Sequence, residues 1–260
     1  MQELDGATQQ RQRTTMEPDA QATARLNEVT NDQARGAITA LVDAFGQLAE
    51  TGRLAVNPDK EHLVQSVFGW WAWITRSSKL VLLAHDAGLG HEAAPNVRSI
   101  LEHTLVMQWV ADLGDEAMAA VGAKADESSR KLFNDLRDQH WSIPEDFNPS
   151  KSPTQAMLDF SSLCTAYGAH NFYIAYRMLS AHIHPTAQGA AVHVDRTTDV
   201  LHSHATRSAD ADLVLVAVCV IHAALTINSL AVEQPLTEAI TLARNHIGHN
   251  IERPVLHNRT

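Results

Sequence analysis

The sequence predicts an all-α protein, a helical bundle of about six or seven helices with a disordered N-terminal segment. Apolar residues recur at helical intervals along most of the chain, and no alternating pattern of convincing length predicts a strand. Hydrophobic residues make up 45% of the 260 residues, enough to bury a substantial core. We therefore expect residues 1–30 to be disordered and residues 31–260 to form a single helical-bundle domain.

The N-terminal segment is rich in Gln, Thr, Ala and charged residues and lacks the aromatic residues that a core needs. No apolar run follows Met1, so the segment does not have the pattern of an export signal.

The first two helices are expected at 31–50 and 57–88. Asn31 or Asp32 is expected to cap the first, and Pro58 occupies an early position of the second. Core packing is the expected role of the tryptophans of the second helix, Trp70, Trp71 and Trp73.

The remaining helices follow from periodicity, prolines and glycines. Their expected ranges are 95–114, 115–140, 154–164, 169–184, 209–231 and 235–249. A proline-containing loop precedes the short helix at 154–164. Residues 185–208 are expected to form the longest irregular connection.

Residues 213–232 are mostly apolar and long enough to span a membrane, but polar residues such as His222 and Asn228 interrupt them. We interpret them as the central helix of the bundle, with no membrane partner. The two cysteines, Cys164 and Cys219, lie in apolar helical surroundings, which favours a reducing compartment and a cytoplasmic location.

Charge argues against an extended DNA-binding or RNA-binding groove. The formal net charge is -10, and no basic stripe is visible. Residues 171–260 are nearly neutral, with six basic and seven acidic side chains. Any RNA binding would therefore be local, in a cleft shared between subunits.

One short stretch, YRMLSAHIHP at 176–185, gathers residues that carry chemistry. At about 100° per residue, helical spacing places Tyr173, Arg177, Ser180 and His184 on one face. His182 lies about 140° from Arg177 and would reach that face only if the helix bent. Pro185 disfavours helical geometry at His184, so the helix is expected to end there.

A second polar group lies in the helix at 95–114. Arg98 and Glu102 share one face and His103 occupies the adjacent one, among apolar residues. Burial would demand partners for these charges. We hypothesise that Glu102 accepts a hydrogen bond from Tyr176, Ser180 or Arg177 across the bundle.

An arginine followed by four to six residues and a histidine near a helix end resembles the signature of HEPN ribonucleases, the higher eukaryote and prokaryote nucleotide-binding superfamily. The intervals from Arg177 to His182 and to His184 both fit, although Met178 replaces the polar residue that often follows the arginine. The pairing of RSILEH (98–103) with YRMLSAHIHP also resembles a group of uncharacterised bacterial helical proteins over about residues 60–230.

The HEPN resemblance implies metal-independent RNA cleavage, or a catalytically silent relative, in bacterial stress or phage defence. It implies a homodimer with RNA in a composite cleft and no cofactor. Arg177 would stabilise the phosphate charge, and His184 would transfer the proton, with His182 as its competitor. The supporting residues would be Tyr173, Tyr176, Ser180, Arg98 and Glu102.

Two alternatives use the same residues. The Tyr, Arg, Ser and His side chains could instead form a structural polar network in a non-enzymatic binding or interaction module. A second alternative is a metal-binding protein that uses the histidines of the region, His182, His184, His193, His202 and His204. No carboxylate or cysteine completes a recognised ligand spacing, so we assign no metal ligands. The sequence does not identify a substrate, a trigger or the oligomeric state.

Overall fold

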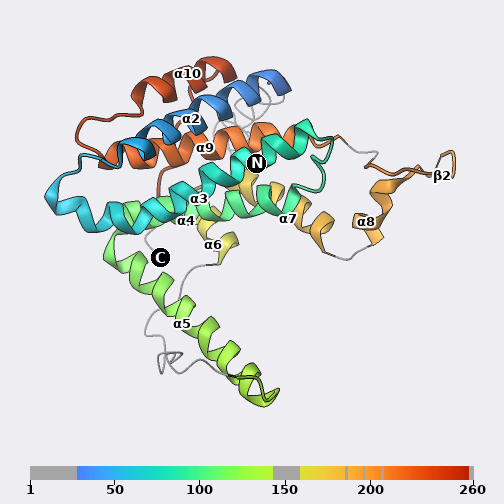
Figure 1. The fold of residues 1–260 in the computed structure, drawn as a ribbon, viewed down its shortest axis with the longest axis horizontal. Helices are drawn as coiled ribbons and strands as arrows, with labels where there is room; N and C mark the ends of the chain where they lie inside the picture. The colour runs from blue at the N-terminus through green and yellow to red at the C-terminus, as the bar shows by residue number, and fades with distance from the viewer. Residues whose placement is uncertain (1–27, 143–158, 185–186, 196, 206–207, 258–260) are drawn as a thin grey trace, which may run out of the picture.

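The computed structural model describes residues 28–142, 159–184, 187–195, 197–205 and 208–257, which form a helical bundle (Figure 1). Seven helices in these ranges have eleven residues or more, which confirms the predicted fold class. They are α2 (Asn31–Thr51), α3 (Glu61–Asp86), α4 (Ala94–Leu113), α5 (Asp115–Asp138), α7 (His170–Ile183), α9 (Asp210–Leu230) and α10 (Thr237–Ile247). The shorter elements are η1 (Pro58–Lys60), α6 (Phe160–Ala166), α8 (Ala187–Ala190) and η2 (Ala191–His193).

Helix α9 is the central element of the bundle. It packs against α2, α3, α4 and α10, so it is buried on nearly every side. This explains why its sequence is apolar around the whole circumference. By length and composition α9 could cross a membrane, and 78% of its most apolar stretch is buried inside the protein.

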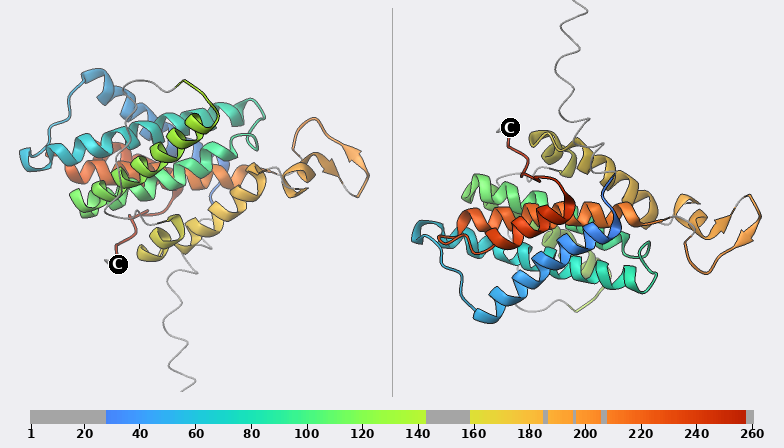
Figure 2. Two further views of the ribbon diagram at one scale, coloured as in Figure 1. Left: turned by 90° about the horizontal axis from the view of Figure 1, so that it is seen from below. Right: turned by 90° about the horizontal axis from the view of Figure 1, so that it is seen from above.

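The other helices surround α9 in an order that places α7 beside α4. Helices α2 and α10 lie together on one side of α9, and α3 and α4 lie on the other (Figures 1 and 2). Gly36 permits the close approach of α2 to α10, because a Cβ atom there would lie 2.5 Å from the His246 ring. Helix α7 packs mainly on α4, and α5 extends away from the bundle (Figure 1).

The helix ends follow local chemistry, with one correction to the prediction. Thr30, and neither Asn31 nor Asp32, caps α2, because its hydroxyl accepts from the Gln33 backbone while the Gln33 side chain accepts from the Thr30 backbone. This reciprocal capping box satisfies two amides at the helix start. Pro58 begins the 3-10 turn η1, so α3 starts three residues later than Pro58, at Glu61.

The tryptophans of α3 contribute to packing in different ways. Trp71 is buried and meets the edges of Phe45 and Phe68 at ring distances of 4.8 and 5.8 Å. Trp70 and Trp73 are half-buried and pack on the core from outside. The core role predicted for this group is therefore fullest for Trp71.

Residues 185–208 were expected to be irregular, but they contain a small hairpin. Strands β1 (Val194–Asp195) and β2 (Val200–Leu201) pair antiparallel, with Val194 opposite Leu201. The Asp195 carboxylate holds the turn by accepting from the side chains of Thr197 and Thr198. The hairpin extends outward from the bundle beyond α8 (Figures 1 and 2).

Two further predictions fall at the limits of the described ranges. The short helix predicted at 154–164 is α6, which begins at Phe160 and has Asp159 as its cap. The proline loop before it and most of the predicted disordered segment lie outside the described residues.

Candidate functional site

The α7 group, which we define as Tyr173, Arg177 and His184, lies on the outside of the bundle. Arg177 is exposed, and its Nη1 atom donates to the Tyr173 hydroxyl at 3.5 Å. The two residues are one turn apart on α7, as the spacing predicts. The Arg177 guanidinium and the Ser161 side chain lower the pKa of Tyr173, because hydrogen bonds to the phenolate oxygen favour the charged form.

His184 lies outside the helix and so does not continue the helical face that it was predicted to share with Arg177. Helix α7 ends at Ile183, and His184 has an extended backbone with φ -83° and ψ 151°. The residue before a proline is driven from helical geometry, so the predicted helix end is confirmed. Helical periodicity no longer fixes the direction of the His184 side chain, which is exposed beyond the end of α7.

His182 has a different environment from His184. It is half-buried in the last turn of α7, and its ring lies 5.2 Å from the ring of His91. Helix α8 packs against this turn, because a Cβ atom at Gly189 would lie 2.9 Å from the His182 carbonyl oxygen and 3.2 Å from that of His184. The two histidines are thus held at the base of the hairpin, one partly covered and one open to solvent.

Tyr176 and Ser180 belong to the side of α7 that faces the bundle. The Ser180 hydroxyl donates to the Tyr176 carbonyl oxygen at 2.7 Å, a bond within the helix. The Tyr176 ring packs against Phe160 of α6, with ring centroids 4.8 Å apart. Ser180 therefore makes a local backbone contact and does not orient Arg177.

Arg98 of α4 joins Tyr176 across the bundle. Its Nη2 atom donates to the Tyr176 hydroxyl at 2.6 Å, and its guanidinium carbon lies 4.4 Å from the centre of the ring. Glu102 lies 3.9 Å from Arg98, and these two side chains are 36% and 20% exposed. Within the described ranges Glu102 makes no hydrogen bond to Tyr176, Ser180 or Arg177, so among the predicted residues Arg98 makes the polar contact between α4 and α7. His103 is separate and stacks on Trp73 at 4.2 Å.

Metal and thiol chemistry find little support in the described part of the chain. No group of three or more His, Cys, Asp or Glu side chains there could hold a metal ion. The rings of His202 and His204 lie 6.2 Å apart in the hairpin region. Within the described residues no third side chain joins them to form a metal site. Burial raises the pKa of both cysteine thiols to about 12, so neither is a ready nucleophile at neutral pH.

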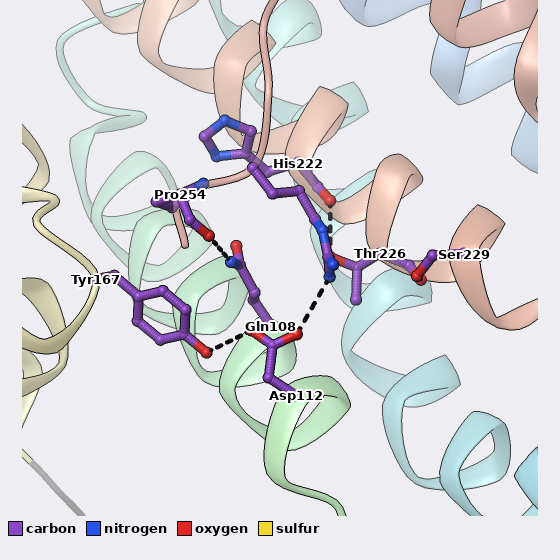
Figure 3. Close-up of polar contacts among 8 residues, drawn as sticks. Gln108, Asp112, Tyr167, His222, Thr226, Ser229 and Pro254 are labelled. Carbon is purple, nitrogen blue, oxygen red and sulfur yellow. Dashed lines mark hydrogen bonds and ion pairs between the residues drawn. The ribbon is translucent and has the colours of Figure 1, made fainter. Parts of the chain in front are cut away.

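The sequence analysis missed a second polar group, the C-terminal cluster, which we define as Gln108, Asp112, Tyr167, His222, Thr226 and Arg253 (Figure 3). The Tyr167 hydroxyl donates to the Asp112 carboxylate at 2.8 Å. Arg253 lies 3.6 Å from Asp112 and donates to the Thr226 hydroxyl at 3.4 Å. One carboxylate thus joins α4, the residue that follows α6 and the C-terminal segment.

The same cluster anchors the chain after α10. The Gln108 amide donates to the Pro254 carbonyl oxygen, and the His257 amide donates to the Ala166 carbonyl oxygen at 2.8 Å. Burial, with a smaller contribution from Asp112, raises the pKa of Tyr167, so the phenol stays protonated and remains a donor. These contacts hold the C-terminal segment, residues 251–257, against the ends of α4 and α9.

His222 is a buried titratable side chain of the cluster, with 6% of the residue exposed. Its ring stacks on Phe172 at 5.8 Å. Burial lowers the pKa of His222 to about 4, so the ring is neutral near pH 7. Its Nδ1 atom and the Gln108 Oε1 atom are buried without a hydrogen-bond partner among the described residues.

Polar residues inside apolar helices are the signal that could have indicated this cluster. Gln108 and His222 interrupt apolar stretches of α4 and α9, and buried polar groups usually require partners. The sequence does not identify those partners, because they are distant along the chain: Pro254 lies 146 positions from Gln108.

The fold and these two groups define an all-helical bundle protein with an exposed Arg and His pair and a separate buried network. The chain belongs to a family of unknown function, DUF5677, whose model matches residues 66–200. This match lies within the 60–230 range of the resemblance to bacterial helical proteins and covers α4 and α7. No curated protein and no solved structure matches the chain.

Proposed function

We propose that this protein is a metal-independent endoribonuclease of the HEPN type, acting on RNA as a homodimer. The observation that carries the proposal is the exposure of Arg177 and His184 at the C-terminal end of α7. Neither side chain is buried by packing in the bundle, whereas Arg98 and Tyr176 form a hydrogen bond inside it. An exposed Arg and His at one helix end remain available for a substrate.

The residue types suit phosphate chemistry. In the proposed reaction the ribose 2′-hydroxyl attacks the adjacent phosphorus and the bond to the 5′-oxygen breaks, leaving a 2′,3′-cyclic phosphate. Arg177 would stabilise the charge that develops on the phosphate oxygens. His184 would transfer a proton, since an imidazole can both donate and accept near neutral pH. His182 is the competing proton carrier at the same turn.

A homodimer would add the second positive group that one acidic chain lacks. Two exposed apolar residues support a contact between copies. Ile174 is three residues from Arg177 and is 57% exposed, and Leu201 at the projecting hairpin is 79% exposed. Apolar residues in such positions suit a protein surface that becomes covered. The apolar surroundings of the two cysteines support a cytoplasmic location. The HEPN resemblance supports a role in bacterial stress or phage defence.

The test is cleavage of a mixed RNA pool in EDTA by the full chain, followed by analysis of the product ends. We expect 2′,3′-cyclic phosphate ends from the wild type and loss of cleavage in Arg177→Ala. Arg76→Ala, which removes an exposed arginine from α3, is the matched control. Comparing His184→Ala with His182→Ala identifies the proton carrier. Absence of cleavage by a well-folded dimer would reject the enzymatic proposal.

A second candidate function is a non-enzymatic binding or interaction module. The bond from Arg98 to Tyr176 and the packing of Phe160 on the same ring favour it, because part of the predicted site is a structural network. Under this candidate Arg98→Ala lowers stability, and no variant of α7 changes the RNA.

A further inference from the structure

Three aromatic rings of α6 and α7 are linked by successive contacts that end beside Arg177. We call them the aromatic row: Phe160, Tyr176 and Tyr173. The Phe160 and Tyr176 rings have their centroids 4.8 Å apart. The Tyr176 and Tyr173 rings lie 6.3 Å apart and within 14° of parallel. Both distances are in the range of favourable aromatic pairs. The row therefore leads from the contact between α6 and α7 to the exposed arginine of the α7 group.

The inner members of the row have a structural role. Arg98 lies over the Tyr176 ring, 4.4 Å from its centre, and donates to its hydroxyl at 2.6 Å. Phe160 packs against the same ring from α6. These contacts join α4, α6 and α7, so packing accounts for the presence of both inner rings.

Tyr173 is the outer member of the row and is held by its hydroxyl. Arg177 donates to the hydroxyl oxygen at 3.5 Å, and the Ser161 side chain also hydrogen-bonds to it. These bonds act in the plane of the ring, at its edge, and do not involve the π faces. Tyr173 is half-buried, and Arg177 beside it is exposed. A ring oriented in this way loses little further freedom when a planar group stacks on it.

The charges around Tyr173 suit contact with one phosphate and not with an extended phosphate backbone. Arg177 provides an exposed positive charge. The negative charge of Asp159 acts on Tyr173, and Glu102 lies 3.9 Å from Arg98. Carboxylates at these positions weaken phosphate binding, so stacking on the aromatic ring is the stronger source of affinity here.

We propose that Tyr173 is a base-stacking residue, which binds the face of one unpaired nucleobase while Arg177 contacts the adjacent phosphate. The bases of a single strand can stack on aromatic side chains, whereas the bases of a duplex are already stacked on one another. The inference rests on the proposed function for its substrate, RNA. It adds the residue that positions a base beside Arg177 and that selects unpaired over paired bases.

The test is binding of a fluorescein-labelled decanucleotide of 2′-O-methyl RNA to the full chain, measured by fluorescence anisotropy. This probe lacks the 2′-hydroxyl and cannot undergo the proposed cleavage. We expect the single strand to bind about tenfold more tightly than a duplex of the same sequence. Tyr173→Phe keeps the π faces and should bind within about twofold of the wild type, whereas Tyr173→Leu should bind about tenfold more weakly. Phe68→Leu removes an exposed ring from α3 and is the matched control, which should bind as the wild type does.

The two tyrosine variants separate stacking from a role of the hydroxyl. Equal losses in Tyr173→Phe and Tyr173→Leu would overturn the proposal, because the hydroxyl and not the ring would then be needed. So would equal binding of single strand and duplex, or no binding of the single strand by the wild type.

A second variant keeps the proposal testable if Tyr173→Leu lowers the unfolding midpoint. Tyr173→Trp retains a π face and should bind at least as tightly as the wild type, and weaker binding would overturn the proposal. The proposed function can fail separately. A chain that binds the probe in the expected pattern and does not cleave unmodified RNA would reject the enzymatic proposal and support the stacking site.

Discussion

The two polar groups of this protein, the α7 group and the C-terminal cluster, contain the same residue types in opposite environments. Each has an arginine, a histidine and a tyrosine. In the C-terminal cluster Tyr167 and His222 are buried and Arg253 contacts Asp112 and Thr226. In the α7 group Arg177 and His184 are exposed, and among the described residues the side-chain partner of Arg177 is a tyrosine of its own helix, at 3.5 Å. Residue type alone therefore does not distinguish a structural network from a candidate site, whereas burial and partners do.

The largest expected effect is the loss of RNA cleavage when the arginine of the α7 group is removed. Arg177→Ala should lower RNA cleavage by about 10²–10³-fold, the usual consequence of removing a donor that stabilises developing charge. Its unfolding free energy should change by less than about 0.5 kcal/mol, because the side chain is exposed. Cleavage rates and urea unfolding curves on the same preparation measure both. Equal loss of stability and activity would show that the arginine is structural.

The second effect is the pH dependence that His222 gives to stability. Its pKa is about 4 in the folded protein and near 6.5 when unfolded, so the unfolded chain binds the proton more readily. The stabilisation is complete above pH about 6.5 and is lost as the pH falls toward about 4, by about 3 kcal/mol.

Urea unfolding across this pH range, for the wild type and His222→Leu, measures that contribution. The variant should show a shallower decline between pH about 6.5 and about 4. His62→Leu replaces an exposed histidine and should keep the wild-type slope. Parallel curves for the wild type and His222→Leu would contradict the buried neutral histidine.

A smaller effect compares two tyrosines. Tyr167→Phe removes the buried donor to Asp112 and should cost about 1–2 kcal/mol, because the carboxylate then loses a hydrogen bond in a partly buried site. Tyr173→Phe removes a hydroxyl whose arginine partner is exposed and should change the unfolding free energy by less than about 0.5 kcal/mol. Thermal or urea unfolding of both variants is sufficient, and a reversed order would mean that the C-terminal cluster contributes little stability.

The smallest expected effect is the loss of stability when the N-terminal cap of α2 is removed. Thr30→Ala removes the cap of α2 and should lower the unfolding free energy by about 1 kcal/mol. Asn31→Ala, at the position that the sequence analysis favoured, should cost less, since Asn31 is the first helical residue. The two unfolding midpoints test the assignment of the cap, and a larger loss in Asn31→Ala would reverse it.

Much of the bundle was predictable because helices of this length carry a strong periodic signal. The end of α7 was also predictable, since Pro185 acts directly on the backbone of His184. The β1–β2 hairpin was not, because two paired residues on each strand are too few for an alternating pattern.

The candidate site was predictable only in part. Spacing placed Tyr173 and Arg177 one turn apart, and the structure has them in contact. Spacing could not show that Ser180 bonds to its own helix backbone, or that Arg98 and not Glu102 reaches Tyr176. The C-terminal cluster depends on contacts between distant segments, and residues 250–257 carry no periodic pattern that would predict their path across α4.

The most direct test compares the two arginines, Arg177→Ala and Arg253→Ala, in one experiment that measures urea unfolding and RNA cleavage per folded molecule. We predict that Arg177→Ala keeps the wild-type unfolding midpoint and loses cleavage. Arg253→Ala should unfold at lower urea and retain cleavage, because it loses the contacts to Asp112 and Thr226. Loss of cleavage in Arg253→Ala, with retention in Arg177→Ala, would contradict the assignment of function to the exposed end of α7.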